Sequence, residues 1–139
     1  MKEYLLDTDI CIFLLQERFK IKEKVEDVGI QKCYISEITI SELTYGAVKS
    51  EQFEKQIQDV IKIESLFSLL PIYESIRSYA EERNRLRKLG ILIPDFDLII
   101  GTTAVHHDMI MVTNNEKHLG RIDSIQIETW TKPPFNHYL

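Results

Sequence analysis

The chain has 139 residues, of which 44% are hydrophobic and 9% aromatic, and we expect one globular domain spanning residues 1–139. Its net charge of −5 argues against a protein that coats nucleic acid non-specifically, because such binding depends on many Lys and Arg contacts with phosphate. The opening MKEYLLDTD turns acidic too early for a signal peptide, and no apolar run approaches the roughly eighteen residues of a membrane span. We therefore expect a cytoplasmic protein that does not enter a membrane.

The first half of the sequence predicts two strand–helix units followed by a helical hairpin. Residues 3–6 (EYLL) and 33–36 (CYIS) are short apolar runs typical of buried strands. Between them, the charged amphipathic segment 19–29 ends in a glycine, as a helix with a C-cap does. Residues 38–50 and 52–67 carry apolar residues at helical spacing, which indicates two neighbouring helices.

The second half continues the alternation of strands and helices. Strands are predicted at 68–72, 109–113 and 125–129, and helices at 74–90 and 94–107. This alternation predicts an α/β sandwich with a mostly parallel central sheet of four to five strands and helices on both faces. Ligands of such sheets bind beyond the carboxyl ends of the strands.

Three acidic residues lie where this architecture would gather them. Asp7 directly follows the first strand, and Asp97 lies in the first turn of a helix, where the helix dipole favours an anion. Glu42 lies on an amphipathic helix at the border of its buried side. Two carboxylates about 4 Å apart repel by roughly 4 kcal/mol at an effective dielectric of about 20, so the three converge only around a divalent cation. Oxygen ligands alone favour Mg²⁺, with Mn²⁺ as the alternative.

Acids at helix starts also have a plainer interpretation. Thr8 and Asp9 can each cap the helix that follows the first strand, and Asp95 can cap the helix that contains Asp97. We interpret Asp9 and Asp95 as caps or solvated charges. Asp7, Glu42 and Asp97 fit that interpretation less well, because each is embedded in apolar sequence. From the residues alone, a metal site and a set of caps both stay open.

Five segments form a pattern that covers nearly the whole chain. They are LLDTDICIFLL at 5–15, YISEITISELTYGAVKS at 34–50, DFDLIIGTTAV at 95–105, VTNNEKHLGRI at 112–122 and IQIETW at 125–130. In order and spacing these segments resemble the PIN-domain ribonucleases, and specifically the VapC toxins of bacterial toxin–antitoxin pairs. The resemblance implies a PIN-like α/β/α sandwich and a Mg²⁺-dependent endoribonuclease that uses water as its nucleophile. It also implies a VapB-type antitoxin partner, a homodimer and an RNA substrate, with tRNA as the first choice.

On this resemblance Asp7, Glu42 and Asp97 take the family's catalytic, metal-binding positions. Many PIN domains carry a fourth acid after the fourth strand, where this chain has Asn114 and Asn115 followed by Glu116. An amide adds no negative charge, so whether a second metal is held stays open, and Glu116 could partly substitute. Three further polar residues are expected to support the site as hydrogen-bond donors: Thr8, Thr113 and Asn115.

Basic residues and histidines are assigned less specific roles. Four cations near the end of the helix at 74–90 either hold RNA phosphates or offset the helix dipole: Arg83, Arg85, Arg87 and Lys88. The four histidines lack metal-ligand spacing beyond one adjacent pair and are interpreted as surface or packing residues: His106, His107, His118 and His137.

Two other functions compete with the ribonuclease. One is a catalytically silent PIN-like module that binds RNA or protein, which would ordinarily have lost one of the three acids, whereas all three are present. The other is a haloacid-dehalogenase-like phosphatase, whose strand–DxD start resembles LLDTD. That enzyme class needs a Thr or Ser, a Lys and then a late acidic pair, whereas here DFD precedes VTNN.

Overall fold

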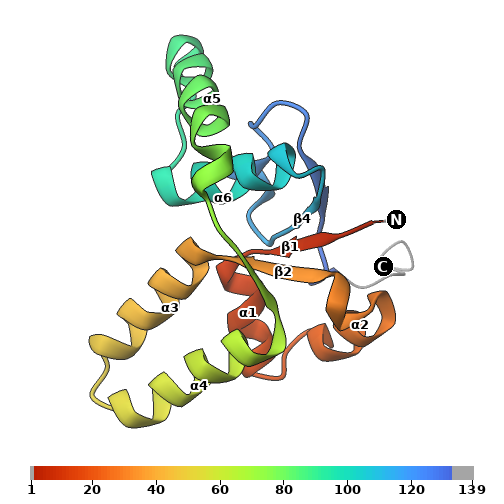
Figure 1. Cartoon of the computed structure of the whole chain (residues 1–139), viewed down its shortest axis with the longest axis vertical. Helices are drawn as coiled ribbons and strands as arrows, with labels where there is room; N and C mark the ends of the chain where they lie inside the picture. Colours follow the sequence, from red (N-terminus) through yellow and green to blue (C-terminus); the bar gives the residue numbers. More distant parts are fainter. Residues whose placement is uncertain (1, 133–139) are drawn as a thin grey trace.

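Five short apolar strands form the centre of the computed structural model, which describes residues 2–132 (Figure 1). The strands are β1 (Tyr4–Leu6), β2 (Cys33–Ser36), β3 (Ser68–Leu70), β4 (Ile110–Val112) and β5 (Gln126–Glu128). They lie in the order β3-β2-β1-β4-β5, and each neighbouring pair is parallel. The expectation of a mostly parallel sheet of four to five strands is confirmed, with five strands in the part of the chain that is described.

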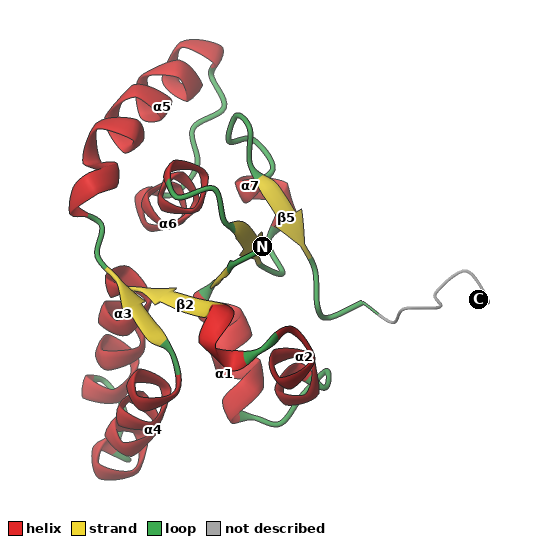
Figure 2. Ribbon diagram, turned by 45° about the vertical axis from the view of Figure 1, so that its right-hand side comes forward, coloured by secondary structure: helices red, strands yellow, loops and turns green. Residues whose placement is uncertain are grey.

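Helices make the connections between these parallel strands. They are α1 (Thr8–Leu15), α2 (Ile21–Val28), α3 (Glu37–Val48), α4 (Phe53–Leu66), α5 (Ile76–Leu89), α6 (Asp95–His106) and α7 (Glu116–Leu119), with 3₁₀ turns η1 (Ile30–Lys32) and η2 (Tyr73–Ser75). Helices α3 and α4 lie side by side as the predicted hairpin (Figures 1 and 2). Between residues 2 and 132, no helix is long and apolar enough to cross a membrane.

Each face of the sheet is covered by a separate hydrophobic core. Helices α1, α2 and α4 cover one face, and helices α5, α6 and α7 cover the other (Figure 2). Leu6 and Val112 belong to the first core, whereas Leu5 and Met111 belong to the second. All four side chains are fully buried. Burial on both faces explains why the central strands β1 and β4 are continuous apolar runs rather than alternating ones.

The strand order reverses at β1. The chain moves outward from β1 to β2 and β3, then crosses back to β4 on the other side of β1 and continues to β5. In parallel sheets such a reversal opens a crevice at the carboxyl ends of the two strands that flank it. Asp7 follows β1 and Thr113 follows β4, and the Asp7 N–H donates to the carbonyl of Val112 at 2.9 Å. This edge of the sheet is therefore where a ligand site is expected.

Candidate active site

Asp7 is buried at the end of β1 and also begins α1 as its N-cap. One carboxylate oxygen accepts the Thr8 N–H at 2.9 Å, and the other accepts the Thr113 hydroxyl at 2.7 Å. Burial, with a further contribution from the charges of Asp9 and Asp97, raises the pKa of Asp7 to about 7 against the lowering effect of these two hydrogen bonds. A buried carboxylate with acidic neighbours and few donors is poised to accept a cation.

Asp97 approaches the same edge of the sheet from the first turn of α6. Its Oδ2 lies 3.3 Å from the amide nitrogen of Asn115, which donates to it, and 3.5 Å from Nδ1 of His118. Asn115 and His118 are three residues apart around α7, so both reach the same carboxylate. His118, interpreted above as a surface or packing histidine, is half-buried and contacts Asp97, whereas His137 lies outside the described residues.

Asp9 also belongs to this acidic group, and its interpretation as a helix cap or solvated charge is wrong. The N-cap of α1 is Asp7, not Thr8 or Asp9. The Oδ2 atom of Asp9 accepts the Asn114 N–H at 3.1 Å, while its Oδ1 is buried with no hydrogen-bond partner among the described residues. Burial raises the pKa of Asp9, and the nearby charge of Asp97 adds to the effect.

Glu42 joins the group indirectly, through Thr8. The Thr8 hydroxyl donates to Glu42 at 2.6 Å and lies 3.1 Å from the Thr39 hydroxyl. Among residues 2–132, Asp7, Glu42 and Asp97 do not have ligand oxygens that all lie within 4.8 Å of one another. Glu42 instead borders an adjacent hollow of about 270 Å³ between α1, α3 and α4. The charge of Asp97 thus acts on the pKa of Asp7. Glu42 is linked to Asp7 through Thr8, which hydrogen-bonds to both carboxylates.

The TNN segment after β4 organises the acids through its backbone and side chains. The Asn115 N–H donates to the Thr113 hydroxyl at 2.9 Å, which folds the segment back on itself. Thr113 is fully buried, and Asn114 supplies only its backbone N–H to the acids. Glu116, considered above as a replacement for the fourth acid, is exposed and pairs with Lys132 at 3.1 Å.

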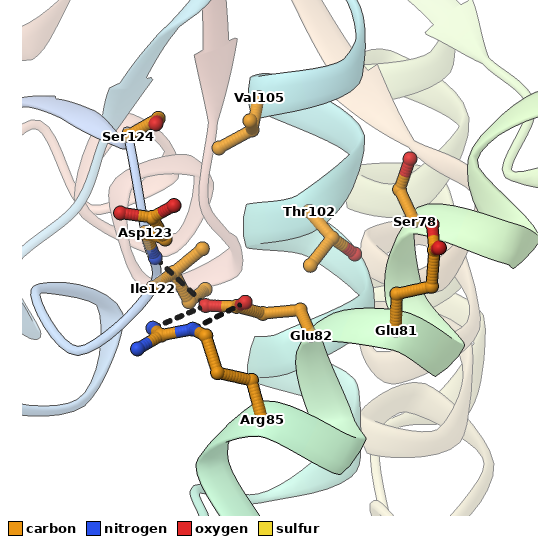
Figure 3. A pocket seen from close by; sticks show the side chains of 9 residues that line it. All are labelled: Ser78, Glu81, Glu82, Arg85, Thr102, Val105, Ile122, Asp123 and Ser124. Carbon is orange, nitrogen blue, oxygen red and sulfur yellow. Dashed lines mark hydrogen bonds and ion pairs between the residues drawn. The ribbon is translucent and has the colours of Figure 1, made fainter.

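Arg85, one of the four cations on α5, is held by hydrogen bonds within the protein. Arg85 forms two hydrogen bonds with Glu82, at 2.8 and 2.7 Å, and donates to the backbone carbonyl of Arg121 at 2.9 Å. The Arg85–Glu82 pair lies at one side of a hollow of about 310 Å³ between α5, α6 and the segment before β5 (Figure 3). Hydrogen bonds from Arg85 lower the pKa of Glu82, so this pair stays charged and fastens α5 to the body of the protein.

The remaining three cations on α5 are exposed. Arg83 contacts Asp95 at 3.2 Å, so Asp95 is the solvated charge at a helix start that the sequence indicated. Arg87 donates to the neighbouring Asn84 at 2.9 Å, and Lys88 is exposed in the last turn. These side chains are free to move toward a phosphate backbone because their contacts are on the surface.

The chemistry of the donors at the strand ends suits a divalent metal ion, although among residues 2–132 the oxygens of Asp7, Asp9 and Asp97 do not all lie within 4.8 Å of one another. The donor set combines the buried carboxylate of Asp7, the Oδ1 of Asp9 that has no hydrogen-bond partner among the described residues, and the carboxylate of Asp97, whose charge raises the pKa of both Asp7 and Asp9. Carboxylate oxygens are the ligands that Mg²⁺ and Mn²⁺ prefer. A divalent cation would offset the repulsion that now raises the pKa values of Asp7 and Asp9.

Comparison with known proteins agrees with the fold. A PIN domain family model matches residues 4–124. Over 132 residues the chain is 33% identical to Ribonuclease VapC1 of Haemophilus influenzae (strain R2866), with 93% of this chain and 98% of the relative covered. Over 134 residues it is 30% identical to the tRNA(fMet)-specific endonuclease VapC of Salmonella typhimurium (strain LT2), with 94% and 99% covered. The crystal structure of DNA-bound VapBC from Salmonella typhimurium matches with a TM-score of 0.87 and 30% identity, covering 94% of this chain and 99% of that one. The chain therefore belongs to the PIN-domain family and, within it, to the VapC ribonucleases of toxin–antitoxin systems.

Proposed function

We propose that this ribonuclease is a Mg²⁺-dependent endoribonuclease that works as the toxin of a toxin–antitoxin pair, with Asp7, Asp97 and Glu42 as its catalytic and metal-binding residues. The observation that carries the proposal is the buried Asp7 carboxylate, whose pKa is raised to about 7 beside Asp9 and Asp97 at the strand ends. A buried carboxylate this costly to charge is typical of a site that binds a cation.

Each residue of the site has a distinct task in this proposal. Asp7 and Asp97 bind the ion directly, and Mn²⁺ can replace Mg²⁺ because both favour oxygen ligands. Bound there, Mg²⁺ supplies the Lewis acidity that polarises a phosphodiester oxygen and makes a water molecule a stronger nucleophile. Thr113 orients Asp7 through its 2.7 Å hydrogen bond, Asn115 orients Asp97, and Thr8 orients Glu42.

RNA, and tRNA as the first choice, is the proposed substrate. The Salmonella relative that is 30% identical is named as a tRNA(fMet)-specific endonuclease, which supports this choice of substrate class. The exposed Arg83, Arg87 and Lys88 are proposed to hold RNA phosphates, whereas Arg85 is held by Glu82 and by the Arg121 carbonyl. Phosphate contacts of this kind set the position of a nucleic acid without reading its sequence.

The proposed partner is a VapB-type antitoxin whose extended tail reaches the acids. Solved relatives are toxin–antitoxin complexes, including DNA-bound VapBC from Salmonella typhimurium, which supports such a partner. A tail Arg or Lys can pair with Asp7 and Asp97 and so compete with the metal. A hollow of about 570 Å³ between α1, α2 and α4, with a lining that is partly apolar and partly charged, offers buried area to offset the entropy lost when the tail becomes ordered. Its apolar lining includes Leu14, Leu15, Val25, Leu66 and Phe67.

The antitoxin proposal is tested with the purified complex and a tail Arg/Lys→Ala variant. The complex is expected to be inactive in Mg²⁺, and the alanine variant is expected to regain cleavage while the partners still bind. A variant complex that stays fully inhibited would show that the antitoxin acts by covering the RNA path instead. Mapping the cut ends of total RNA after incubation with the free toxin then identifies the substrate, and ends that never fall in tRNA would contradict that part of the proposal.

A further inference from the structure

A separate group of potential metal ligands lies at the far end of α6 from Asp97. It consists of Glu74, His106 and His107, whose ligand atoms all lie within 4.8 Å of one another. Asp97 and His106 are nine residues apart on the same helix, which corresponds to roughly 14 Å along its axis. The two groups therefore belong to different sites, and among residues 2–132 this is the one set of three His, Cys, Asp or Glu side chains that close together.

The backbone around this group holds its members in place. Glu74 lies in the 3₁₀ turn η2, and the next residue, Ser75, is buried and shares a 2.9 Å hydrogen bond with the buried Thr103 on α6. Ser75 also donates to the carbonyl of Ile72 at 2.9 Å. Turn η2 is thus held against α6 one helical turn before the two histidines. These buried contacts fix the position of Glu74 next to them.

The two histidines converge although they are adjacent in the sequence. His106 is the last residue of α6 and His107 is its C-cap, and their rings lie 4.9 Å apart at 89°. Nδ1 of His106 lies 3.4 Å from the Ser78 hydroxyl, a contact of the kind that orients a metal-binding imidazole. Nε2 of His107 is buried and has no hydrogen-bond partner among the described residues. A buried ring nitrogen without a partner is unfavourable unless a ligand satisfies it.

The local charge also favours a cation here. The carboxyl end of α6 carries the negative end of the helix dipole, and the Glu74 carboxylate adds a full negative charge beside it. Two imidazoles and one carboxylate are ligands that Zn²⁺ binds in a tetrahedral arrangement, with water in the fourth position. Mg²⁺ by contrast prefers oxygen ligands alone, as at the Asp7 site.

We propose that Glu74, His106 and His107 form a Zn²⁺ site that clips the connection between β3 and α5 to the end of α6. Helix α5 carries the proposed RNA-binding cations, and helix α6 carries Asp97. The bound ion would therefore fix the position of α5 relative to α6. The site is independent of the nuclease chemistry, because none of its three ligands lies within the acidic group.

The test is Zn²⁺ binding by the metal-free full-length protein, measured by calorimetry and, with Co²⁺ as a probe, by visible absorption. Wild-type protein is expected to bind one Zn²⁺ with two nitrogen ligands and to gain thermal stability from it. His106→Ala and Glu74→Gln are expected to weaken this binding at least about tenfold and to lose the gain in stability. Both residues are exposed, so these variants should fold.

Two controls separate this site from the acidic one. His118→Ala, which removes the histidine beside Asp97, and Asp97→Asn are expected to keep wild-type affinity for that Zn²⁺. Binding that survives His106→Ala and Glu74→Gln but is lost in Asp97→Asn would overturn the proposal, as would the absence of Zn²⁺ binding by the wild-type protein at micromolar concentrations. Neither result would affect the proposed nuclease, because RNA cleavage is not the readout.

Discussion

Asp7 has two roles that conflict at neutral pH. As the N-cap of α1 it accepts the Thr8 N–H, which stabilises the helix start, and as a buried carboxylate it costs free energy to ionise. The second role dominates, because burial and the neighbouring acids Asp9 and Asp97 raise its pKa although two hydrogen bonds lower it. The residue is therefore a source of instability in the metal-free protein, which a bound cation relieves.

This raised pKa predicts how stability depends on pH. The unfolded chain releases the Asp7 proton near pH 3.9 and the folded chain near pH 7, so between these values the folded state binds more protons. The free energy of unfolding of the metal-free protein should therefore fall as pH rises across that window and level off above it. At roughly 1.4 kcal/mol per pKa unit the loss reaches at most about 4 kcal/mol.

Asp7→Asn should remove most of this dependence while keeping a good helix cap. In EDTA the variant should be as stable as wild type near pH 4 and more stable at pH 8, as measured by urea unfolding. A wild-type protein that gains stability from pH 5 to pH 8 relative to Asp7→Asn would contradict the assignment of a raised pKa to this residue.

A second prediction concerns Thr8, a residue that we expect to position Glu42 rather than to contact RNA. Thr8→Val removes the hydroxyl that donates to Glu42 at 2.6 Å and should lower kcat for RNA cleavage about 10- to 100-fold with little change in KM. Thr8→Ser keeps the hydroxyl and should restore most of the activity. If Thr8→Val cleaves RNA at the wild-type rate, the position of Glu42 does not depend on this contact.

At the residue scale, the structure brings Asp7, Asp97, Thr113 and Asn115 to one edge of the sheet as the sequence predicted, whereas the helix-cap interpretation of Asp9 was wrong. Asp9 was interpreted as a helix cap because a capping aspartate and a metal-binding aspartate look the same in sequence. The buried Oδ1 atom, which has no hydrogen-bond partner among the described residues, is what distinguishes the two interpretations. His118 could have been found from its spacing, since it lies three residues after Asn115 on a short helix. The indirect link from Glu42 to Asp7 through Thr8 depends on how α3 packs against α1, which no local sequence pattern predicts.

At the scale of elements, the contact between α6 and α7 depends on a glycine. A Cβ atom at Gly101 would overlap Cδ1 of Ile122 and lie 2.8 Å from Cδ1 of Leu119, whereas a Cβ atom at Gly46 on α3 meets no atom within 4 Å. Gly101 therefore allows α6 to approach the segment that carries Asn115 and His118.

These two glycines predict opposite effects of the same substitution. Gly46→Ala should raise the free energy of unfolding by about 1 kcal/mol, because alanine favours the helix. Gly101→Ala gains the same propensity but overpacks a buried contact, which typically costs about 1–3 kcal/mol, so a net loss of about 1 kcal/mol is expected. Chemical denaturation of both variants checks this, and a Gly101→Ala protein as stable as Gly46→Ala would show that Ile122 and Leu119 adjust freely.

The sequence predicted the longer elements better than the short ones. The α3–α4 hairpin and the apolar strands follow from periodicity, which needs two or more turns or a continuous run to be recognised. Helix α7 spans only Glu116–Leu119 and η2 only Tyr73–Ser75, too short for such a signal. Both elements are fixed by contacts with α6 instead, and both carry residues of the proposed sites.

For the whole molecule, we propose a homodimer that covers apolar side chains on the helical hairpin. Tyr45 and Val48 on α3 are 65% and 63% exposed, and Ile61 on α4 is 51% exposed. Val48→Asp should shift the protein from dimer to monomer in light scattering, because a charge is costly in a buried interface. Leu89→Asp, at a 58% exposed position on α5, is the matched control and should leave the dimer intact. Wild-type protein that is monomeric at high micromolar concentration would contradict the proposal.

The proposed catalytic acids lie where the strand order reverses beside β1. There Asp7 and the TNN segment lie next to Asp97. The most direct test of this account is RNA cleavage by wild-type protein and Asp97→Asn, each assayed in Mg²⁺ and in EDTA, with circular dichroism to confirm folding. We predict cleavage only by wild-type protein in Mg²⁺, with both proteins folded. Cleavage by wild-type protein in EDTA, or wild-type rates from folded Asp97→Asn in Mg²⁺, would contradict the claim that this acidic group binds the catalytic metal.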